Sequence, residues 1–110
     1  MTIKIALLGK NTVAVNALEI LLDKNVEIAL VSPNNSDTGE DGWQRSLLKK
    51  ANHNNLSVKQ FSKIKHVSSI EYLKMLQLDF IFSIQYDQLI SQEVIDTAKN
   101  GAINLHFAPL

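Results

Sequence analysis

The sequence contains no cysteine, and this absence removes several classes of function at once. Disulfide bonds, thiolate catalysis and zinc sites built from cysteine are excluded. The three histidines, His53, His66 and His106, lie far apart in the sequence and match no spacing typical of a metal site. No apolar run approaches the roughly 20 residues that a membrane-spanning helix needs. We therefore expect neither a metal centre nor a membrane anchor.

The chain also lacks a net charge at pH 7, because its 11 basic side chains balance its 11 acidic ones. Proteins that bind nucleic-acid phosphates or anionic lipid usually carry a basic excess, so we expect neither partner. The first apolar run begins soon after Met1, which leaves no room for a signal peptide and favours the cytoplasm. With 45% hydrophobic residues, the chain can bury the core of one small domain.

Short apolar runs typical of buried strands recur along the chain. They occupy residues 3–8, 26–31, 56–60, 79–84 and 102–105. Several of these runs are apolar at consecutive positions, which is typical of strands that are covered on both faces of a parallel sheet.

Segments with helical periodicity lie between these runs. We expect Asn11 or Thr12 to cap the first helix, a second helix over residues 43–54, and a third that begins at Ser68 with a capping box. A short fourth helix follows Ser91. This alternation predicts an α/β fold, a Rossmann-like doubly wound parallel sheet with flanking helices.

The last run, residues 102–105, predicts a short buried strand that is stopped by Pro109. Side chains two residues apart on a strand point to the same side, so Asn104 and His106 are aimed at one volume. Ligands of open α/β sheets lie beyond the carboxyl ends of the strands, where this pair occurs. The pattern alone also fits a structural histidine, and the position is what favours a catalytic pair.

Asn104-x-His106, followed by Phe107-Ala108-Pro109-Leu110, resembles the signature of the 10-formyltetrahydrofolate-dependent formyltransferases. This family includes methionyl-tRNA formyltransferase, glycinamide ribonucleotide formyltransferase and the nucleotide-sugar N-formyltransferases. Family members continue with a basic, glycine-containing turn and, further on, a catalytic aspartate. The resemblance therefore implies that residues 1–110 form the N-terminal part of a catalytic domain, without the remainder of that domain.

The resemblance implies a reaction in which an amine attacks the formyl group of 10-formyltetrahydrofolate. Asn104 would orient the formyl group and donate a hydrogen bond to its oxygen as negative charge develops there. His106 would donate to the same oxygen and assist proton transfer, next to a carboxylate that the family supplies beyond Leu110. We expect the 110-residue chain by itself to be weakly active or inactive.

The resemblance also implies that a turn after the fourth apolar run contacts the pterin ring of the folate. The turn consists of Tyr86, Asp87, Gln88, Leu89 and Ile90. Backbone polar groups beside apolar side chains suit a flat, amide-rich ring. Asp87 and Gln88 stand where many relatives have glycine and an apolar residue, and an ordinary loop between a strand and a helix is the alternative.

Two further residues are candidates for binding the acceptor substrate. Lys10 lies beside a helix N-terminus and could contact a phosphate, the alternative being a solvated lysine. Trp43 could stack on a nucleotide or a sugar, the alternative being half-buried packing. The first turn has a single glycine, Gly9, in place of Gly-x-Gly-x-x-Gly, which argues against a nicotinamide-dependent dehydrogenase.

The segment Phe107-Ala108-Pro109 looks more like the sugar N-formyltransferases than the methionyl-tRNA enzymes. We therefore expect the acceptor to be the amine of a nucleotide-linked amino sugar. Methionyl-tRNA formyl transfer and a non-catalytic α/β binding module remain as alternatives. An apolar final strand without a neighbour would also favour self-association into a homo-oligomer.

Overall fold

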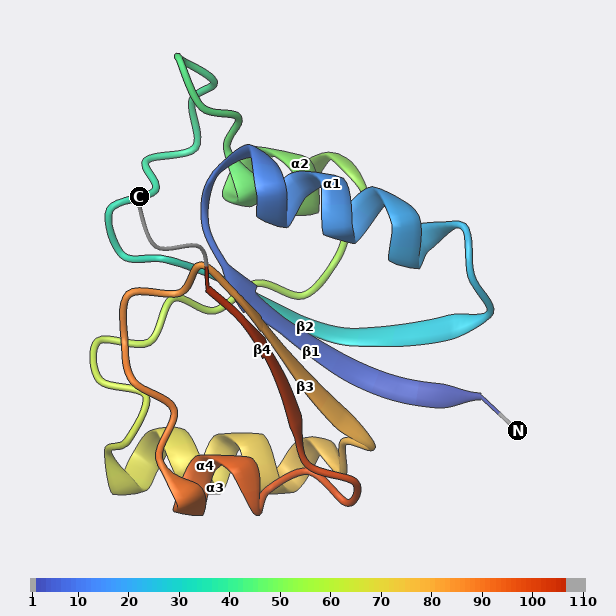
Figure 1. Cartoon of the computed structure of the whole chain (residues 1–110), viewed down its shortest axis with the longest axis vertical. Coiled ribbons are helices and arrows are strands. Elements are labelled where there is room, and N and C mark those ends of the chain that lie inside the picture. The colour runs from blue at the N-terminus through green and yellow to red at the C-terminus, as the bar shows by residue number, and fades with distance from the viewer. Residues whose placement is uncertain (1, 107–110) are drawn as a thin grey trace.

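The computed structural model describes residues 2–106. In this part of the chain four strands, β1 (Ile3–Gly9), β2 (Val26–Pro33), β3 (Phe80–Ile84) and β4 (Ala102–Leu105), form a single sheet. All neighbouring strands are parallel, and their order is β2-β1-β3-β4 (Figure 1). The predicted α/β fold with a parallel, doubly wound sheet is confirmed.

Helices cover both faces of this sheet. Figure 1 shows α1 (Asn11–Leu22) and α2 (Leu47–His53) on one face, and α3 (Val67–Leu76) and α4 (Gln92–Ile95) on the other. The chain winds outwards from β1 to β2 and then passes back to β3, so the switch point of the sheet lies between β1 and β3. None of the helices formed by residues 2–106 is both long and apolar enough to cross a membrane.

The alternation of side chains along the strands divides the core into two clusters. The cluster under α1 and α2 includes Leu7, Ala14, Val15, Leu18, Val31, Leu47 and Ala51. The cluster under α3 and α4 includes Ala6, Leu8, Leu30, Ile70, Leu73, Ile81 and Val94. Each fully buried leucine, isoleucine or valine contributes about 1.5–3 kcal/mol to the free energy of unfolding, so these clusters hold the sheet and helices together.

The four strands end in one row. Gly9 is the register partner of Pro33 on one side and of Ile84 on the other, and Ile84 is in turn the partner of Leu105. The residues that follow the four strand ends are Asn34, Lys10, Gln85 and His106. We call this edge of the sheet the carboxyl rim.

A register shift makes this level row possible. β2 has eight residues and β1 has seven. Ile5 is the partner of Ile28, whereas Ala6 is the partner of Leu30, so Ala29 is left over between them. This β-bulge absorbs the additional residue, and both strands end at the carboxyl rim.

The prediction of a strand at residues 56–60 is wrong. Val58 forms an isolated bridge with Val31 beside the edge of the sheet, supported by hydrogen bonds of Val31 to Ser57 and Lys59. Leu56 and Val58 both pack against the core cluster under α1 and α2, but Lys59 and Gln60 after the bridge are polar and exposed, so the pairing does not extend into a ladder. The sheet of residues 2–106 consequently has four strands, and five were expected.

The second helix begins at Leu47, four residues later than predicted. Ser46 is its N-cap, and the Ser46 hydroxyl accepts a hydrogen bond from the N–H of Lys49 at 3.0 Å. Trp43 therefore lies outside the helix, and its side chain is 95% exposed. The alternative of half-buried packing for Trp43 is wrong.

The third helix begins at Val67 and not at Ser68. His66 occupies the N-cap position, and its ring accepts a hydrogen bond from the N–H of Ser68 at 3.4 Å. The Ser68 hydroxyl binds the same ring nitrogen at 2.9 Å, so it is not available to cap the helix itself. Ser91 does cap α4 as predicted, since it accepts from the N–H of Val94.

The final strand is confirmed at residues 102–105, but it is exposed and not buried. β4 pairs with β3 on one side and forms an edge of the sheet that residues 2–106 build. The side chains of Ile103 and Leu105 are 52% and 42% exposed because, within residues 2–106, neither α1 nor α2 extends over that part of the sheet. The Phe107-Ala108-Pro109-Leu110 motif lies outside the described residues.

Candidate functional site

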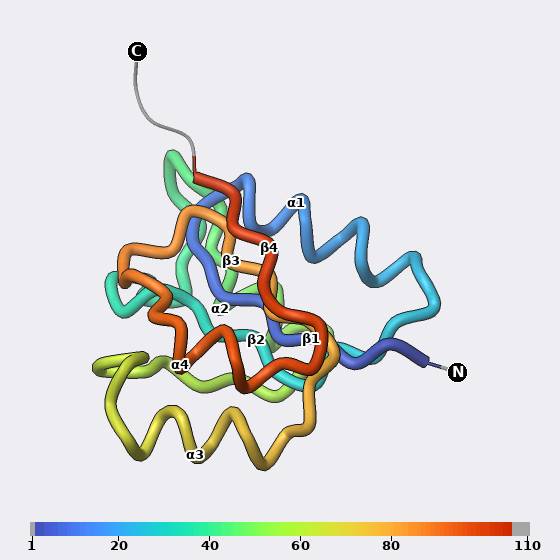
Figure 2. The backbone as a smooth tube through the Cα atoms, turned by 60° about the horizontal axis from the view of Figure 1, so that its bottom comes forward, coloured from blue at the N-terminus to red at the C-terminus, as the bar shows by residue number. Residues whose placement is uncertain are grey.

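Asn104 and His106 both reach the carboxyl rim. Asn104 is the register partner of Ser83 in β3, and strand alternation puts it on the same face as Ala102, towards α3 and α4. His106 follows the last residue of β4, and both side chains are exposed. The carbonyl of Leu105 accepts a hydrogen bond from the N–H of Gln85 at 2.9 Å. The end of β4 is thereby fixed to the turn after β3, and Figure 2 shows the two segments side by side.

The turn after β3 begins in an unusual backbone conformation. Gln85 has a φ of 57°, in the left-handed region that favours glycine. Tyr86 then turns inward and is buried, and burial raises the pKa of its hydroxyl, an effect that the nearby Ser32 hydroxyl opposes. Leu89 is 90% exposed, whereas Ile90 packs against the core beneath α3 and α4. The turn thus offers one exposed apolar side chain at the rim.

Gln88 holds this turn to the segment that precedes α3. Its side-chain oxygen accepts a hydrogen bond from the N–H of Ile64 at 2.6 Å. Its side-chain nitrogen donates to the carbonyl of Phe61 at 2.9 Å and to the Tyr86 hydroxyl at 3.3 Å. The Gln88 side chain is therefore a structural tether between the turn and the segment before α3.

Asp87 lies at the centre of the polar contacts on the rim. Its carboxylate accepts hydrogen bonds from the Lys10 ammonium at 2.5 Å and from the Asn34 side-chain amide at 2.8 Å. Lys10 lowers the pKa of Asp87 most, while burial opposes this effect and Asn34 and the charge of His106 add to it. His106 is thus within electrostatic reach of a carboxylate that this chain itself supplies.

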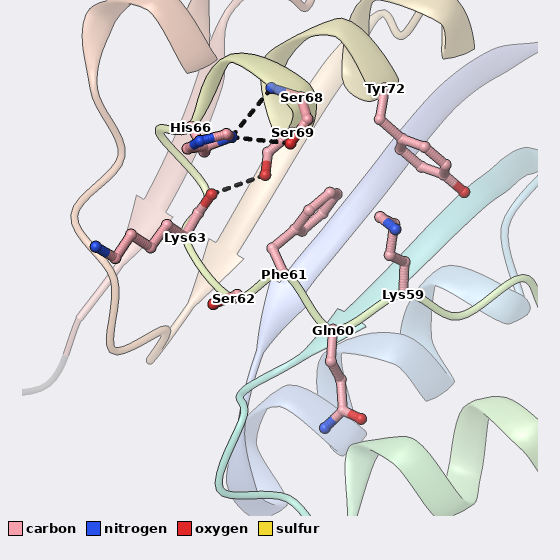
Figure 3. A pocket seen from close by; sticks show the side chains of 9 residues that line it. All are labelled: Lys59, Gln60, Phe61, Ser62, Lys63, His66, Ser68, Ser69 and Tyr72. Atoms are coloured by element: carbon pink, nitrogen blue, oxygen red, sulfur yellow. Dashed lines mark hydrogen bonds between the residues drawn. The ribbon is translucent and has the colours of Figure 1, made fainter.

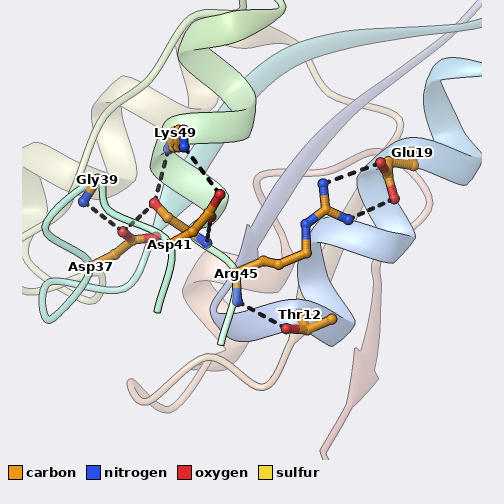
Figure 4. A network of polar contacts seen from close by, with 8 residues as sticks. Thr12, Glu19, Asp37, Gly39, Asp41, Arg45 and Lys49 are labelled. Carbon is orange, nitrogen blue, oxygen red and sulfur yellow. Dashed lines mark hydrogen bonds and ion pairs between the residues drawn. The ribbon is translucent and has the colours of Figure 1, made fainter. Parts of the chain in front are cut away.

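Trp43 lies on a different loop, residues 34–46, which carboxylates organise (Figure 4). Asp37 accepts hydrogen bonds from the N–H of Gly39 and of Leu48 and from the Ser46 hydroxyl. Asp41 accepts from the N–H of Ser46 and pairs with Lys49 at 3.1 Å. These contacts fix the second half of the loop at the start of α2.

The same loop is also joined to the first turn of α1. The N–H of Thr12 donates to the side-chain oxygen of Gln44 at 3.0 Å, and the Thr12 hydroxyl accepts from the N–H of Arg45 at 2.9 Å. Lys10 occupies the N-cap position of α1 without a side-chain cap, so neither Asn11 nor Thr12 plays the predicted role. Trp43 directly precedes two anchored residues and is presented to solvent from a fixed backbone.

A hollow of about 490 Å³ lies between α3 and the segment before it (Figure 3). Its lining residues are Lys59, Gln60, Phe61, Ser62, Lys63, His66, Ser68, Ser69 and Tyr72. The Lys59 ammonium lies 5.0 Å from the centre of the Tyr72 ring and 5.7 Å from that of Phe61. None of the predicted site residues lines this hollow, so it is separate from the Asn104 and His106 pair.

The structure brings Asn104, His106 and the turn of residues 85–90 together, with Lys10 beside them. Trp43 belongs to the neighbouring loop. Sequence reasoning missed Asn34, whose signal was its position shortly after the second apolar run. No group of three or more metal-ligating side chains occurs among residues 2–106.

No model of a known protein family matches the chain. Among curated proteins, the methionyl-tRNA formyltransferase of Pelagibacter ubique is 33% identical over 110 residues, which cover 96% of this chain and 36% of that protein. The methionyl-tRNA formyltransferase of Clostridium tetani is 33% identical over 106 residues, which cover 94% of this chain and 34% of that protein. The chain thus spans about a third of the length of the curated relatives that it matches.

Solved structures give the same family. A sugar 3N-formyltransferase crystallised with dTDP and 5-N-formyl-THF has a TM-score of 0.64 and 34% identity, covering 90% of this chain and 32% of its own. An N-formyltransferase from Helicobacter canadensis, in complex with folinic acid and dTDP-3-aminofucose, has a TM-score of 0.64 and 32% identity. The match covers 89% of this chain and 33% of that one. The phosphoribosylglycinamide formyltransferase of Bacillus halodurans shares the fold, with a TM-score of 0.63 and 13% identity. The match covers 92% of this chain and 54% of that one. By sequence and by fold, the chain belongs to the formyltransferase family.

Proposed function

We propose that the protein containing this chain transfers a formyl group from 10-formyltetrahydrofolate to the amine of a nucleotide-linked amino sugar. The observation that carries the proposal is the position of Asn104 and His106, which lie exposed at the carboxyl rim beside the turn of residues 85–90. Two structural neighbours above 30% identity are sugar N-formyltransferases by name or by their bound ligands, and both hold a formylated folate.

The residues at the rim fit a folate. The exposed Leu89 offers an apolar surface for a flat ring, and the turn around it offers backbone hydrogen-bonding groups. The folate supplies the formyl carbon. The Asn104 amide would orient the formyl group and donate a hydrogen bond to its oxygen, and His106 would donate to that oxygen and move a proton during transfer.

Trp43 is the candidate contact for the acceptor. A large aromatic side chain that is 95% exposed gains no stability from packing, so a ligand-binding role accounts for its place next to two anchored residues. A nucleobase is a planar ring of the kind that stacks on tryptophan. Lys10 lies on the same rim, with its ammonium on the Asp87 carboxylate.

Methionyl-tRNA formyl transfer is the second candidate function. Its support is the 33% identity of the chain to two curated methionyl-tRNA formyltransferases. The balanced charge of the chain argues against it, because tRNA-binding surfaces carry an excess of basic residues. Formyl transfer measured with a dTDP-linked amino sugar and with methionyl-tRNA distinguishes the two acceptors.

The test of the proposed function uses the full-length protein and labelled 10-formyltetrahydrofolate. We expect Asn104→Ala and His106→Ala each to slow transfer by about 100- to 1000-fold, the usual cost of removing a group that stabilises developing charge. Asn100→Ala and His53→Ala change the same residue types at exposed positions away from the pair, and we expect wild-type rates from both. Wild-type rates from the two site variants would overturn the roles of Asn104 and His106, and absence of transfer by the unmodified protein would favour a non-catalytic module.

A further inference from the structure

One carboxylate joins three loops of the carboxyl rim. Asp87 follows β3, and its side chain binds Lys10, which follows β1, and Asn34, which follows β2. The N–H of Asp87 also donates to the side-chain oxygen of Asn34 at 3.2 Å. These contacts span 77 and 53 positions of the sequence and enclose the switch point between β1 and β3. We call the three residues the rim clasp.

Asn34 is the fixed part of the rim clasp. Its side chain is 5% exposed, and its N–H donates to the carbonyl of Gly9 at 2.8 Å. Its side-chain nitrogen also binds the Ser36 hydroxyl, and its carbonyl accepts from the side chain of Gln60 at 3.0 Å. Because these contacts do not involve Asp87, Asn34 provides an anchor to which the turn after β3 can be attached.

The turn needs such an anchor. Gln85 holds a left-handed backbone conformation without being glycine, and a conformation of this kind persists where surrounding contacts enforce it. Gln88 attaches one side of the turn to Phe61 and Ile64, and Asp87 attaches the other side to Lys10 and Asn34. Leu89 then projects into solvent from a turn that is held from two directions.

We infer that the rim clasp positions the turn of residues 85–90 for folate binding, and that Lys10 and Asp87 act through this turn. The inference rests on the proposed function and adds positioning residues to it. A turn that is already ordered binds its ligand without paying the entropy of becoming ordered. Asp87 and Lys10 are therefore positioning residues for the folate. Lys10 acts by holding the Asp87 carboxylate, and not by binding the acceptor.

The experiment measures binding of 5-formyltetrahydrofolate to the full-length protein by calorimetry, together with the KM of the acceptor. We expect Asp87→Ala and Lys10→Met each to weaken folate binding by about 5- to 10-fold, with the acceptor KM unchanged. The double variant should bind folate no more weakly than the weaker single variant, because both substitutions remove one shared contact. Asp87→Asn should fall between wild type and Asp87→Ala, since an amide can keep a contact with Asn34 but loses the ion pair.

Lys49→Met is the matched control. It breaks an ion pair of similar kind, at 3.1 Å between Lys49 in α2 and Asp41 in the loop before α2, and neither residue belongs to the turn. We expect wild-type folate affinity from it. Melting temperatures of all variants separate lost binding from lost folding, and Asp87→Asn replaces Asp87→Ala if the latter does not fold.

Two results would overturn the rim clasp. One is wild-type folate affinity in a folded Asp87 variant. The other is a raised acceptor KM for Lys10→Met with additive effects of the two substitutions, which would place Lys10 on the acceptor. A wild-type protein that binds the folate but transfers no formyl group would contradict the proposed function while leaving the affinity comparison intact. A wild-type protein that does not bind folate would overturn both.

Discussion

Gly9 sets the distance between the end of β1 and the end of β3. A Cβ atom at this position would lie 2.5 Å from the carbonyl oxygen of Ile84 and 3.0 Å from the Cβ of Ala14. The residue is buried at the last position of β1, where Lys10 and the rim begin. The single glycine of the first turn is therefore required by close packing, and not by a dinucleotide.

We expect Gly9→Ala to lower the free energy of unfolding by about 1–3 kcal/mol, the usual cost of forcing an additional carbon into a packed interior. Urea denaturation measures this difference. Gly42→Ala is the control, because a Cβ there would meet no atom within 4 Å, and its effect should stay within about 0.5 kcal/mol. Equal stability of the two variants would show that β1 and β3 can separate without cost.

At the candidate site, the sequence was sufficient to locate some residues and insufficient for others. The placement of Asn104 and His106 beside the 85–90 turn follows from strand order and the rule that parallel strands end at one edge. The pairing of Lys10 with Asp87 could not be predicted, because it depends on how two loops 77 positions apart fold back on each other. Local patterns of hydrophobicity carry no information about such a contact.

Among the helices and strands, apolar runs predicted β1, β2 and β3 because burial decides their conformation, whereas β4 was found by the same pattern although its side chains are mostly exposed. The run at residues 56–60 does not form a strand because its apolar side chains, Leu56 and Val58, are followed by the exposed Lys59 and Gln60, and only Val58 pairs with the sheet. The start of α2 was misplaced because the residues before Leu47 are held by Thr12 and by two aspartates, and not by helical hydrogen bonds. Helix boundaries set by distant partners are not visible in periodicity.

The end of α3 gives a prediction for a helix terminus. Gln77 is its C-cap residue and has a φ of 54°, which costs a residue with a side chain about 1–2 kcal/mol. We expect Gln77→Gly to raise the free energy of unfolding by about 0.5–1 kcal/mol, after the greater flexibility of glycine in the unfolded chain is subtracted. Gln77→Ala removes the same side chain and should give no gain. Thermal unfolding of both variants measures the difference, and a gain from alanine would contradict the explanation.

Considered as one body, residues 2–106 bury one core cluster on each face of the sheet and leave the β4 edge of the sheet open. β4 exposes Ile103 and Leu105 beside its unpaired backbone groups, a combination that favours pairing with another chain. The expectation of a buried last strand failed because β4 has a neighbour on one side in the part of the chain that the structure describes. Fold class, in contrast, follows from the order of elements and was predicted correctly.

We expect the 110-residue chain to associate as its concentration rises, and Ile103→Lys to reduce this association by placing a charge on the edge strand. Light scattering over a concentration series gives the average mass. Ile20→Lys is the control, because Ile20 is also exposed but lies on α1 and not on a sheet edge. Equal masses for the unmodified chain and the Ile103 variant at every concentration would contradict the prediction.

The β-bulge at Ala29 makes the pairing of residues 26–28 with β1 independent of the pairing of residues 30–33. Deleting Ala29 would give β1 and β2 an uninterrupted ladder, while residues 30–33 would keep their present partners. A change of chain length at the amino end of β2, or in residues 23–25 before it, can therefore be absorbed without moving the carboxyl rim. Asn34 and its contacts with Asp87 would stay in place after such a change.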